Sequence, residues 1–310
     1  MKIVALAGGV GGAKLADGLA QILPPEDLTI IVNIGDDFEH LGLKICPDLD
    51  TVCYTLAGLS NPETGWGRVD ETWNFMQSIS ELGGSDWFQL GDRDLATHLE
   101  RTRRLKSGQS LSQITSAFCQ AWGIQPTILP ASDDTIPTIV ETTEGELPFQ
   151  EYFVAQRCEP TVKGFRFEGI ASAKPAPGVL SAIEASDLII FCPSNPWVSI
   201  DPILAIPGIR AALENKPVMA VSPIIGGQAV KGPAAKMYTE LGITPSAHAV
   251  AAHYQSIIDS LVIDSVDQQQ AASINALGIK TFITPTFMQT ISDHKRLAAE
   301  CLEFQNNSDS

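Results

Sequence analysis

Four glycines follow the first apolar run of the chain and could bring backbone close to a ligand. They are Gly8, Gly9, Gly11 and Gly12. Residues 2–7 predict a buried parallel strand, and apolar residues at helical spacing follow the glycines, so the glycines mark a turn from strand to helix. Residues without Cβ let backbone amides at a helix N-terminus approach an anion. We therefore predict phosphate binding here, with Gly9, Gly11, Gly12 and Lys14 as contacts.

Neither of two familiar phosphate-binding motifs describes this loop. A P-loop needs Ser or Thr after Gly-Lys, whereas Lys14 lies between Ala13 and Leu15. The dinucleotide fingerprint needs a third glycine at the position of Lys14. The sequence thus favours phosphate binding by another arrangement, and a glycine-rich turn without a ligand is the alternative.

Acidic side chains cluster shortly after the second apolar run. Their positions are Asp36, Asp37, Asp48 and Asp50. Carboxylates beside a phosphate site indicate a hard cation between them, because Mg²⁺ binds one or two carboxylates together with phosphate oxygens. We predict that these four aspartates hold Mg²⁺ and that Asp37 and Asp50 also contact substrate. The alternative is that Asp48 or Asp50 caps the helix that follows.

Arg93 stands between Asp92 and Asp94 in the segment LGDRDLATH. A guanidinium held by acidic neighbours can present a planar fork to phosphate or carboxylate. It can equally form a surface ion pair that contributes little to stability. Taken alone, this segment favours the ion pair.

Further polar loops follow two later apolar runs. Ser194 and Asn195 come after LIIFC. Ser222 is the last residue of VMAVS, and Gly226 and Gly227 follow that run. Ligands bind outside the carboxyl ends of parallel strands, so these loops and the glycine loop are expected to line one crevice. We predict that all five residues contact substrate.

The order of apolar and helical segments predicts one α/β domain over residues 1–310. Strands alternate with helices, which is typical of a Rossmann-like, doubly wound parallel sheet in a three-layer α/β/α arrangement. A mostly helical segment and a small β extension, together about 60–172, are inserted, and residues 305–310 are expected to be disordered. Strands are expected at 2–7, 28–33, 138–142, 164–171, 188–192, 218–222, 260–263 and 280–283. Helices are expected at 67–82, 95–122 with Ser110 as an N-cap, 178–186, 201–214, 230–241, 267–277 and 286–304.

Composition limits the possible partners. The net charge of −16 argues against nucleic acid as a partner, which needs a positive surface. No apolar stretch approaches the ~20 residues of a membrane span, and the first strand begins at the N-terminus, so we expect a cytoplasmic protein without a membrane partner. The six cysteines show no zinc spacing and are expected to be reduced.

Seven motifs together resemble the 2-phospho-L-lactate transferase family of coenzyme F420 biosynthesis. In chain order from residue 8 to about 237 they are GGVGGAKL, NIGDD, CPDLDTVCYTLAG, LGDRDLATH, LPASDD, PSNPWVSIDPIL and SPIIGGQAVKGPAAKM. Val10 stands where many relatives have Thr. More distant relatives that share the glycine loop are bacterial growth and cell-shape factors, so a non-catalytic nucleotide-binding regulator is the alternative function.

The resemblance implies a specific reaction. The donor would be lactyl-2-diphospho-5′-guanosine or its enolpyruvoyl analogue, and the acceptor 7,8-didemethyl-8-hydroxy-5-deazariboflavin (Fo). Transfer of the phospholactyl or phosphoenolpyruvyl group would give F420-0, or its dehydro form, and GMP. The resemblance also implies Mg²⁺, a homodimer, and acceptor-side catalytic roles for Asp50 and Arg93. The glycine loop and the later loops would hold guanosine diphosphate.

Overall fold

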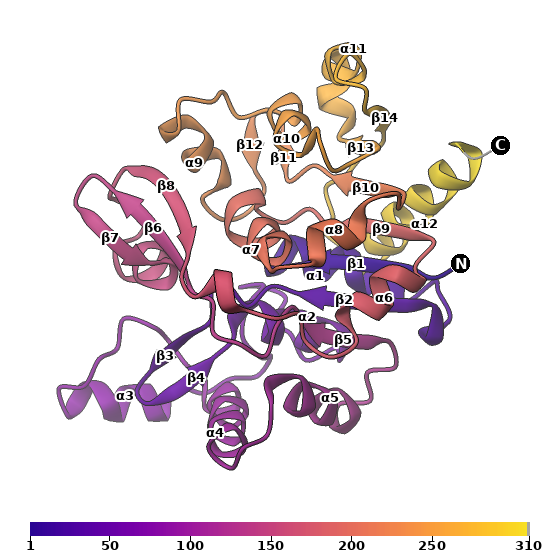
Figure 1. The fold of residues 1–310 in the computed structure, drawn as a ribbon. Helices are drawn as coiled ribbons and strands as arrows, with labels where there is room; N and C mark the ends of the chain where they lie inside the picture. Colours follow the sequence, from indigo (N-terminus) through magenta and orange to yellow (C-terminus); the bar gives the residue numbers. More distant parts are fainter. Residues whose placement is uncertain (309–310) are drawn as a thin grey trace.

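The computed structural model describes residues 1–308 and is built around a seven-stranded parallel sheet (Figure 1). The strand order is β14-β13-β10-β9-β1-β2-β5, and every neighbouring pair is parallel. The strands are β1 (Ile3–Ala7), β2 (Leu28–Val32), β5 (Thr127–Pro130), β9 (Leu188–Phe191), β10 (Val218–Val221), β13 (Ser260–Ile263) and β14 (Lys280–Ile283). The predicted α/β class is confirmed.

Helices cover the two faces of this sheet (Figure 1). On one face α1 packs against α2 and α12, and on the other α8 packs against α6 and α7. The helices are α1 (Gly9–Ala20), α2 (Pro47–Leu56), α3 (Asn74–Glu81), α4 (Asp92–Lys106), α5 (Leu111–Ala121), α6 (Val179–Ala185), α7 (Asp201–Ala205), α8 (Ile209–Leu213), α9 (Ala234–Glu240), α10 (Ala247–Tyr254), α11 (Ala271–Asn275) and α12 (Ile291–Ser308).

The order in which strands are added to the sheet reverses at β1. After β1 the chain builds β2 and β5 on one side, then returns to place β9 on the other. Ala7 pairs with Val32 of β2, and Leu6 pairs with Phe191 of β9. The loops after β1 and β9 therefore diverge at the carboxyl end of the sheet, which is where open α/β sheets bind ligands.

Smaller sheets extend from this core. β3 (Phe38–His40) pairs with β4 (Leu43–Ile45), and β6 (Thr138–Thr142) lies between β7 (Gly145–Pro148) and β8 (Val162–Phe167). A third pair is β11 (Ile224–Ile225) with β12 (Gln228–Ala229). The insertion expected at about 60–172 is interrupted, because β5 at its middle pairs with β2 in the central sheet. Its helical part thus lies before β5 and its β extension after it.

Several predicted boundaries are wrong. The helix expected at 67–82 is only α3, because residues 67–73 form turns and loop. The helix expected at 201–214 divides into α7 and α8, since Gly208 between them has a φ of 93°, outside the helical region. α12 continues to Ser308, so disorder at 305–308 is not observed, and residues 309–310 lie outside the described residues.

No helix within residues 1–308 has both the length and the apolar character that crossing a membrane requires. Most buried apolar residues form one core around β1, β2, β9, β10 and β13, and Ile45, Met76 and Leu90 form a second, smaller cluster.

Candidate active site

The glycine loop packs directly on the loop that follows β9. The Gly8 amide donates to Ser194 Oγ at 3.1 Å, and Ser194 Oγ donates to the Gly8 carbonyl at 2.8 Å. An added Cβ at Gly12 would lie 2.5 Å from Ser194 Oγ, and one at Gly11 would collide with the Pro193 carbonyl oxygen. Gly11 and Gly12 are therefore required by contact between two loops of this protein, whether or not a ligand is bound.

Asp48 ties the glycine loop to the loop after β2. Asp48 Oδ1 accepts a hydrogen bond from the Gly9 amide at 2.7 Å, and Oδ2 accepts one from Asn33 Nδ2 at 2.9 Å. The side chain makes no cap bond for its own helix, whose N-cap residue is Cys46. Asp48 thus accepts a hydrogen bond from an amide at the start of α1, and it does not cap α2, the helix to which it belongs. Burial raises its pKa to about 6, against the effect of these two hydrogen bonds.

Asp36 and Asp37 follow β2 and have different surroundings. Asp36 Oδ2 accepts from Gln150 Nε2 at 3.1 Å, and burial together with the charges of Asp48 and Asp37 raises the pKa of Asp36 well above its usual value. Both carboxylate oxygens of Asp37 are buried and lack a hydrogen-bond partner among residues 1–308, although Lys44 Nζ lies 3.2 Å from Oδ2. Asp37 therefore keeps capacity to bind a ligand.

Asp50 points into a second buried cluster, formed by α2 and α4. Its Oδ1 contacts the guanidinium of Arg101, while Oδ2 lies 3.6 Å from His98 Nδ1 and has no hydrogen-bond partner in the described chain. His98 Nε2 lies 3.1 Å from Asp94, which accepts from the Tyr54 hydroxyl at 2.6 Å. Burial raises the pKa of Asp50, and Arg101 and His98 oppose that rise. Burial would lower the pKa of Arg101, but Asp50 outweighs it, so Arg101 stays a cation.

Arg93 lies outside this cluster. Its side chain is 54% exposed, donates to the Val69 carbonyl at 3.3 Å and lies 3.8 Å from Asp70. Asp92 accepts hydrogen bonds from the Asn74 and Phe75 amides and so caps α3. Arg93 thus forms a surface ion pair, but its partner is Asp70 and not the adjacent Asp92 or Asp94, and its proposed catalytic role stays a prediction.

The remaining predicted contacts are held mainly by bonds within the protein. Lys14 Nζ donates to the Met288 carbonyl at 2.6 Å, and Asn195 Oδ1 accepts from the Trp197 amide at 3.1 Å. The Ser222 hydroxyl donates to the Ile224 carbonyl at 2.9 Å. The Gly226 amide donates to Asp267 Oδ2 at 2.9 Å, and Gly226 and Gly227 have φ values of 56° and 77°. Ser194 is thus brought onto the glycine loop, whereas a substrate role for the others stays a prediction.

Comparison with known proteins identifies the family of this chain. The family model described as 2-phospho-L-lactate transferase CofD matches residues 3–283. A phosphoenolpyruvate transferase of Streptomyces griseus is 45% identical over 98% of each chain, and a 2-phospho-L-lactate transferase of Methanosarcina mazei is 40% identical over 96% of this chain and 98% of the relative.

The chain belongs to the 2-phospho-L-lactate transferase family. It is accordingly an enzyme, a transferase of coenzyme F420 biosynthesis, as its motifs indicated. A crystal structure of a UPF0052-family protein from Bacillus halodurans has a TM-score of 0.66 at 16% identity, over 97% of this chain and 98% of that one. This second likeness concerns the fold.

Sequence reasoning missed three residues of this transferase's buried cluster. Asp94, His98 and Arg101 recur at helical spacing on α4, and that spacing was the available signal. Asp50, Asp94 and His98 each offer a ligand atom within 4.8 Å of one another, a spacing that could hold a metal ion. The guanidinium of Arg101 already contacts Asp50 Oδ1, so Oδ2 is the oxygen of Asp50 that is left for such an ion.

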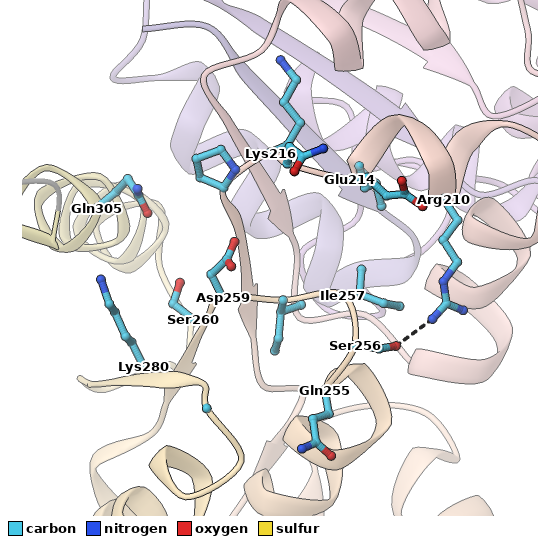
Figure 2. A pocket seen from close by; sticks show the side chains of 15 residues that line it. Arg210, Glu214, Lys216, Gln255, Ser256, Ile257, Asp259, Ser260, Lys280 and Gln305 are labelled. Carbon is cyan, nitrogen blue, oxygen red and sulfur yellow. Dashed lines mark hydrogen bonds between the residues drawn. The ribbon is translucent and has the colours of Figure 1, made fainter.

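A cavity of about 850 Å³ lies at the opposite end of the transferase's sheet (Figure 2). It is lined by the first residues of β13 and β14 and by Arg210, Lys216 and Asp259. None of the predicted site residues lines it. The cavity is therefore separate from the loops after β1, β2 and β9.

Proposed function

We propose that this enzyme transfers a phospholactyl or phosphoenolpyruvyl group from a guanosine-diphosphate-linked donor to Fo. The donor would be lactyl-2-diphospho-5′-guanosine or enolpyruvoyl-2-diphospho-5′-guanosine. A ribityl hydroxyl of Fo attacks the β-phosphorus and gives up its proton, the new P–O bond forms, and the P–O bond to GMP breaks, so that GMP leaves with the proton. The product is F420-0 or its dehydro form. The enolpyruvoyl donor is favoured because the more similar of the two relatives is named a phosphoenolpyruvate transferase.

One observation carries this proposal. Asp37 and Asp50 are buried, and each keeps a carboxylate oxygen without a hydrogen-bond partner in the described part of the chain. Leaving a buried charged oxygen unsatisfied is costly, so such atoms point to an external partner. They stand after β2 and on α2, next to the glycine loop that Asp48 anchors.

These two acids fit a bound Mg²⁺. Mg²⁺ is usually held by one or two carboxylates plus phosphate oxygens, which matches Asp37 and Asp50 with a diphosphate. Asp36 and Asp48, which were predicted as ligands too, have oxygens engaged by Asn33, Gln150 and the Gly9 amide. When bound, Mg²⁺ would neutralise charge on the diphosphate.

The residues of the chain would then act by positioning. Phosphoryl transfer depends on alignment and charge stabilisation more than on covalent catalysis. Arg101 contacts Asp50 Oδ1 and would hold this carboxylate in one orientation, which leaves Oδ2, beside His98, for a ligand. Amides of the glycine loop that Asp48 and Ser194 do not engage would contact the donor phosphates.

A reconstitution experiment tests the proposal. Purified protein is incubated with Fo, Mg²⁺ and each donor, and GMP release and product mass are followed. We expect GMP and the adduct of Fo in equal amounts, with faster turnover of the enolpyruvoyl donor. Binding of guanosine diphosphate without any product from either donor would instead support the regulator.

We also propose that the enzyme works in the cytoplasm as a homodimer. The exposed Trp66 and Trp73 offer apolar surface of the kind that a second copy could cover. The charge of −16 is unfavourable for nucleic acid. Light scattering after size-exclusion chromatography should give twice the chain mass, and a monomer would contradict the assembly.

A further inference from the structure

Three guanidinium groups lie around the Asp50 cluster, and two of them already have partners. Arg101 is buried and contacts Asp50 and, at 3.2 Å, His98 Nδ1. Arg93 is exposed and bonded to the Val69 carbonyl. Neither has a free fork directed at a reacting group. The third guanidinium, that of Arg68, differs from both.

Arg68 has no anionic partner within residues 1–308. Its Nε is buried without a hydrogen bond, and its side chain forms no ion pair with any residue of the described chain, while its Cζ lies 5.6 Å from the centroid of the Tyr54 ring. Glu71 is near enough to feel the charge of Arg68. The two oxygens of Glu71 are already used, however, because they accept from the amides of Arg93 at 2.7 Å and Asp94 at 2.8 Å.

The position of Arg68 links the two halves of the site. The backbone of Arg68 forms an isolated antiparallel β-bridge with that of Ser60. This bridge closes the base of the loop 60–68, and the tip of the loop reaches the glycine loop. At the tip, the Thr64 carbonyl accepts from Lys231 Nζ at 2.9 Å, and an added Cβ at Gly65 would lie 3.1 Å from Val10 Cγ1. At the base, Arg68 covers Tyr54, whose hydroxyl bonds Asp94. Arg68 therefore lies between the glycine loop and the buried cluster that contains Tyr54, Asp94 and Asp50.

We propose that Arg68 binds an anionic group of the phosphorylated donor. A half-buried guanidinium with unpaired donors is unfavourable until an anion completes it, and its planar fork matches phosphate or carboxylate oxygens. The inference rests on the proposed function, since the donor carries both a diphosphate and the carboxylate of its three-carbon acid. Arg68 would thus bind the donor, whereas Asp50 would act on the side of the acceptor.

Calorimetric titration tests this role. GMP, guanosine diphosphate and each complete donor are titrated, with Mg²⁺, into the wild type, Arg68→Gln, Arg68→Lys and the control Arg166→Gln. Arg166 is a surface residue paired with Glu146 on the β extension. We expect Arg68→Gln to weaken donor binding by about tenfold or more, Arg68→Lys to retain part of it, and Arg166→Gln to leave it unchanged.

The probes separate the two anionic groups. Weaker binding of guanosine diphosphate assigns Arg68 to the phosphates, whereas weaker binding of the complete donor alone assigns it to the carboxylate. Unchanged donor binding in Arg68→Gln, or an equal loss in Arg166→Gln, overturns the proposal. Guanidinium ion added to Arg68→Gln should restore binding, which a purely structural role would not allow. If that variant does not fold, the same comparison is made with Arg68→Lys.

These readouts are independent of the proposed reaction. If the wild type binds donor but forms no product with Fo, the proposed function fails while the binding role of Arg68 is still tested. If product forms and Arg68→Gln binds donor normally, only the role of Arg68 fails.

Discussion

The two ends of the central sheet differ in what they leave unsatisfied. At the amino end, a cavity of about 850 Å³ is lined by charged side chains, and Lys216 and Asp259 among them form hydrogen bonds with the backbone of the protein. Lys216 Nζ donates to the Glu184 and Ser186 carbonyls, and Asp259 Oδ2 accepts from the Val218 amide. At the carboxyl end, Asp37 and Asp50 are buried with free oxygens. Buried carboxylate oxygens without a hydrogen bond, more than available room, distinguish the end that we propose for catalysis.

The largest effect is expected for Asp50→Asn at the carboxyl end. The variant keeps an oxygen for Arg101 but loses the charge that Mg²⁺ would bind, so turnover should fall by at least about 100-fold, or ~3 kcal/mol of barrier. Initial rates over a range of Mg²⁺ concentrations measure this. Circular dichroism must show an intact fold, because Arg101 loses its buried counter-charge. Near-normal rates at limiting Mg²⁺ would remove Asp50 from the site.

A smaller effect is expected for Arg93→Lys. If Arg93 leaves Asp70 to bind the acceptor, lysine keeps the charge but not the planar fork, and turnover should fall about tenfold, ~1.4 kcal/mol. Guanosine diphosphate binding should not change. Parallel kinetics and calorimetry check both. An unaltered KM for Fo and an unaltered rate would leave Arg93 as the exposed ion pair of the structure.

Stability should depend on pH through Asp48. Its folded pKa of about 6 exceeds the usual value of 3.8, so the folded state binds more protons than the unfolded state between about pH 6 and pH 4. Stability should therefore rise as pH falls through this window, by up to about 3 kcal/mol. Urea unfolding at pH 7 and pH 4 measures the change in the free energy of unfolding, with Asp48→Asn as the control that reduces the difference. Equal pH dependence in both proteins would contradict this assignment.

The smallest effect is expected at the amino end. Lys280→Gln removes a charge from the cavity but touches none of the loops after β1, β2 and β9. Turnover and donor binding should stay within about twofold of the wild type, because surface substitutions away from a site usually change little. A tenfold loss in either measurement would mean that both ends of the sheet take part in function.

The sequence predicted the elements better than the contacts between them. The strands at 138–142, 260–263 and 280–283 and the cap at Ser110 were correct, because each depends on local pattern. β5 was not recognised as a strand of the main sheet, since four residues with an exposed first position give little periodicity. The local sequence pattern thus predicts single helices and strands, while the order of strands in the sheet depends on pairing between segments that are distant in the sequence.

The site shows the same limit. Glycines and aspartates could be selected by type, but nothing local shows that Asp48 bonds the Gly9 amide or that Asp50 faces α4. Asp94 and Arg93 are adjacent, yet one is buried and the other exposed, because a helix turns successive side chains about 100° apart. Which of them enters the site depends on how α4 packs, and only the folded chain determines that.

The contact between Gly8 and Ser194 has a consequence for synthesis. It joins residues 186 positions apart, and β9 must insert beside β1 before the glycine loop gains its neighbour. A growing chain therefore cannot assemble this site until the segment after β9 has left the ribosome, even if the first strands have already paired. Contacts so distant in sequence form slowly, so the capacity to bind donor should be among the last properties acquired during folding. During refolding, the recovery of donor binding should therefore lag behind the recovery of helix content.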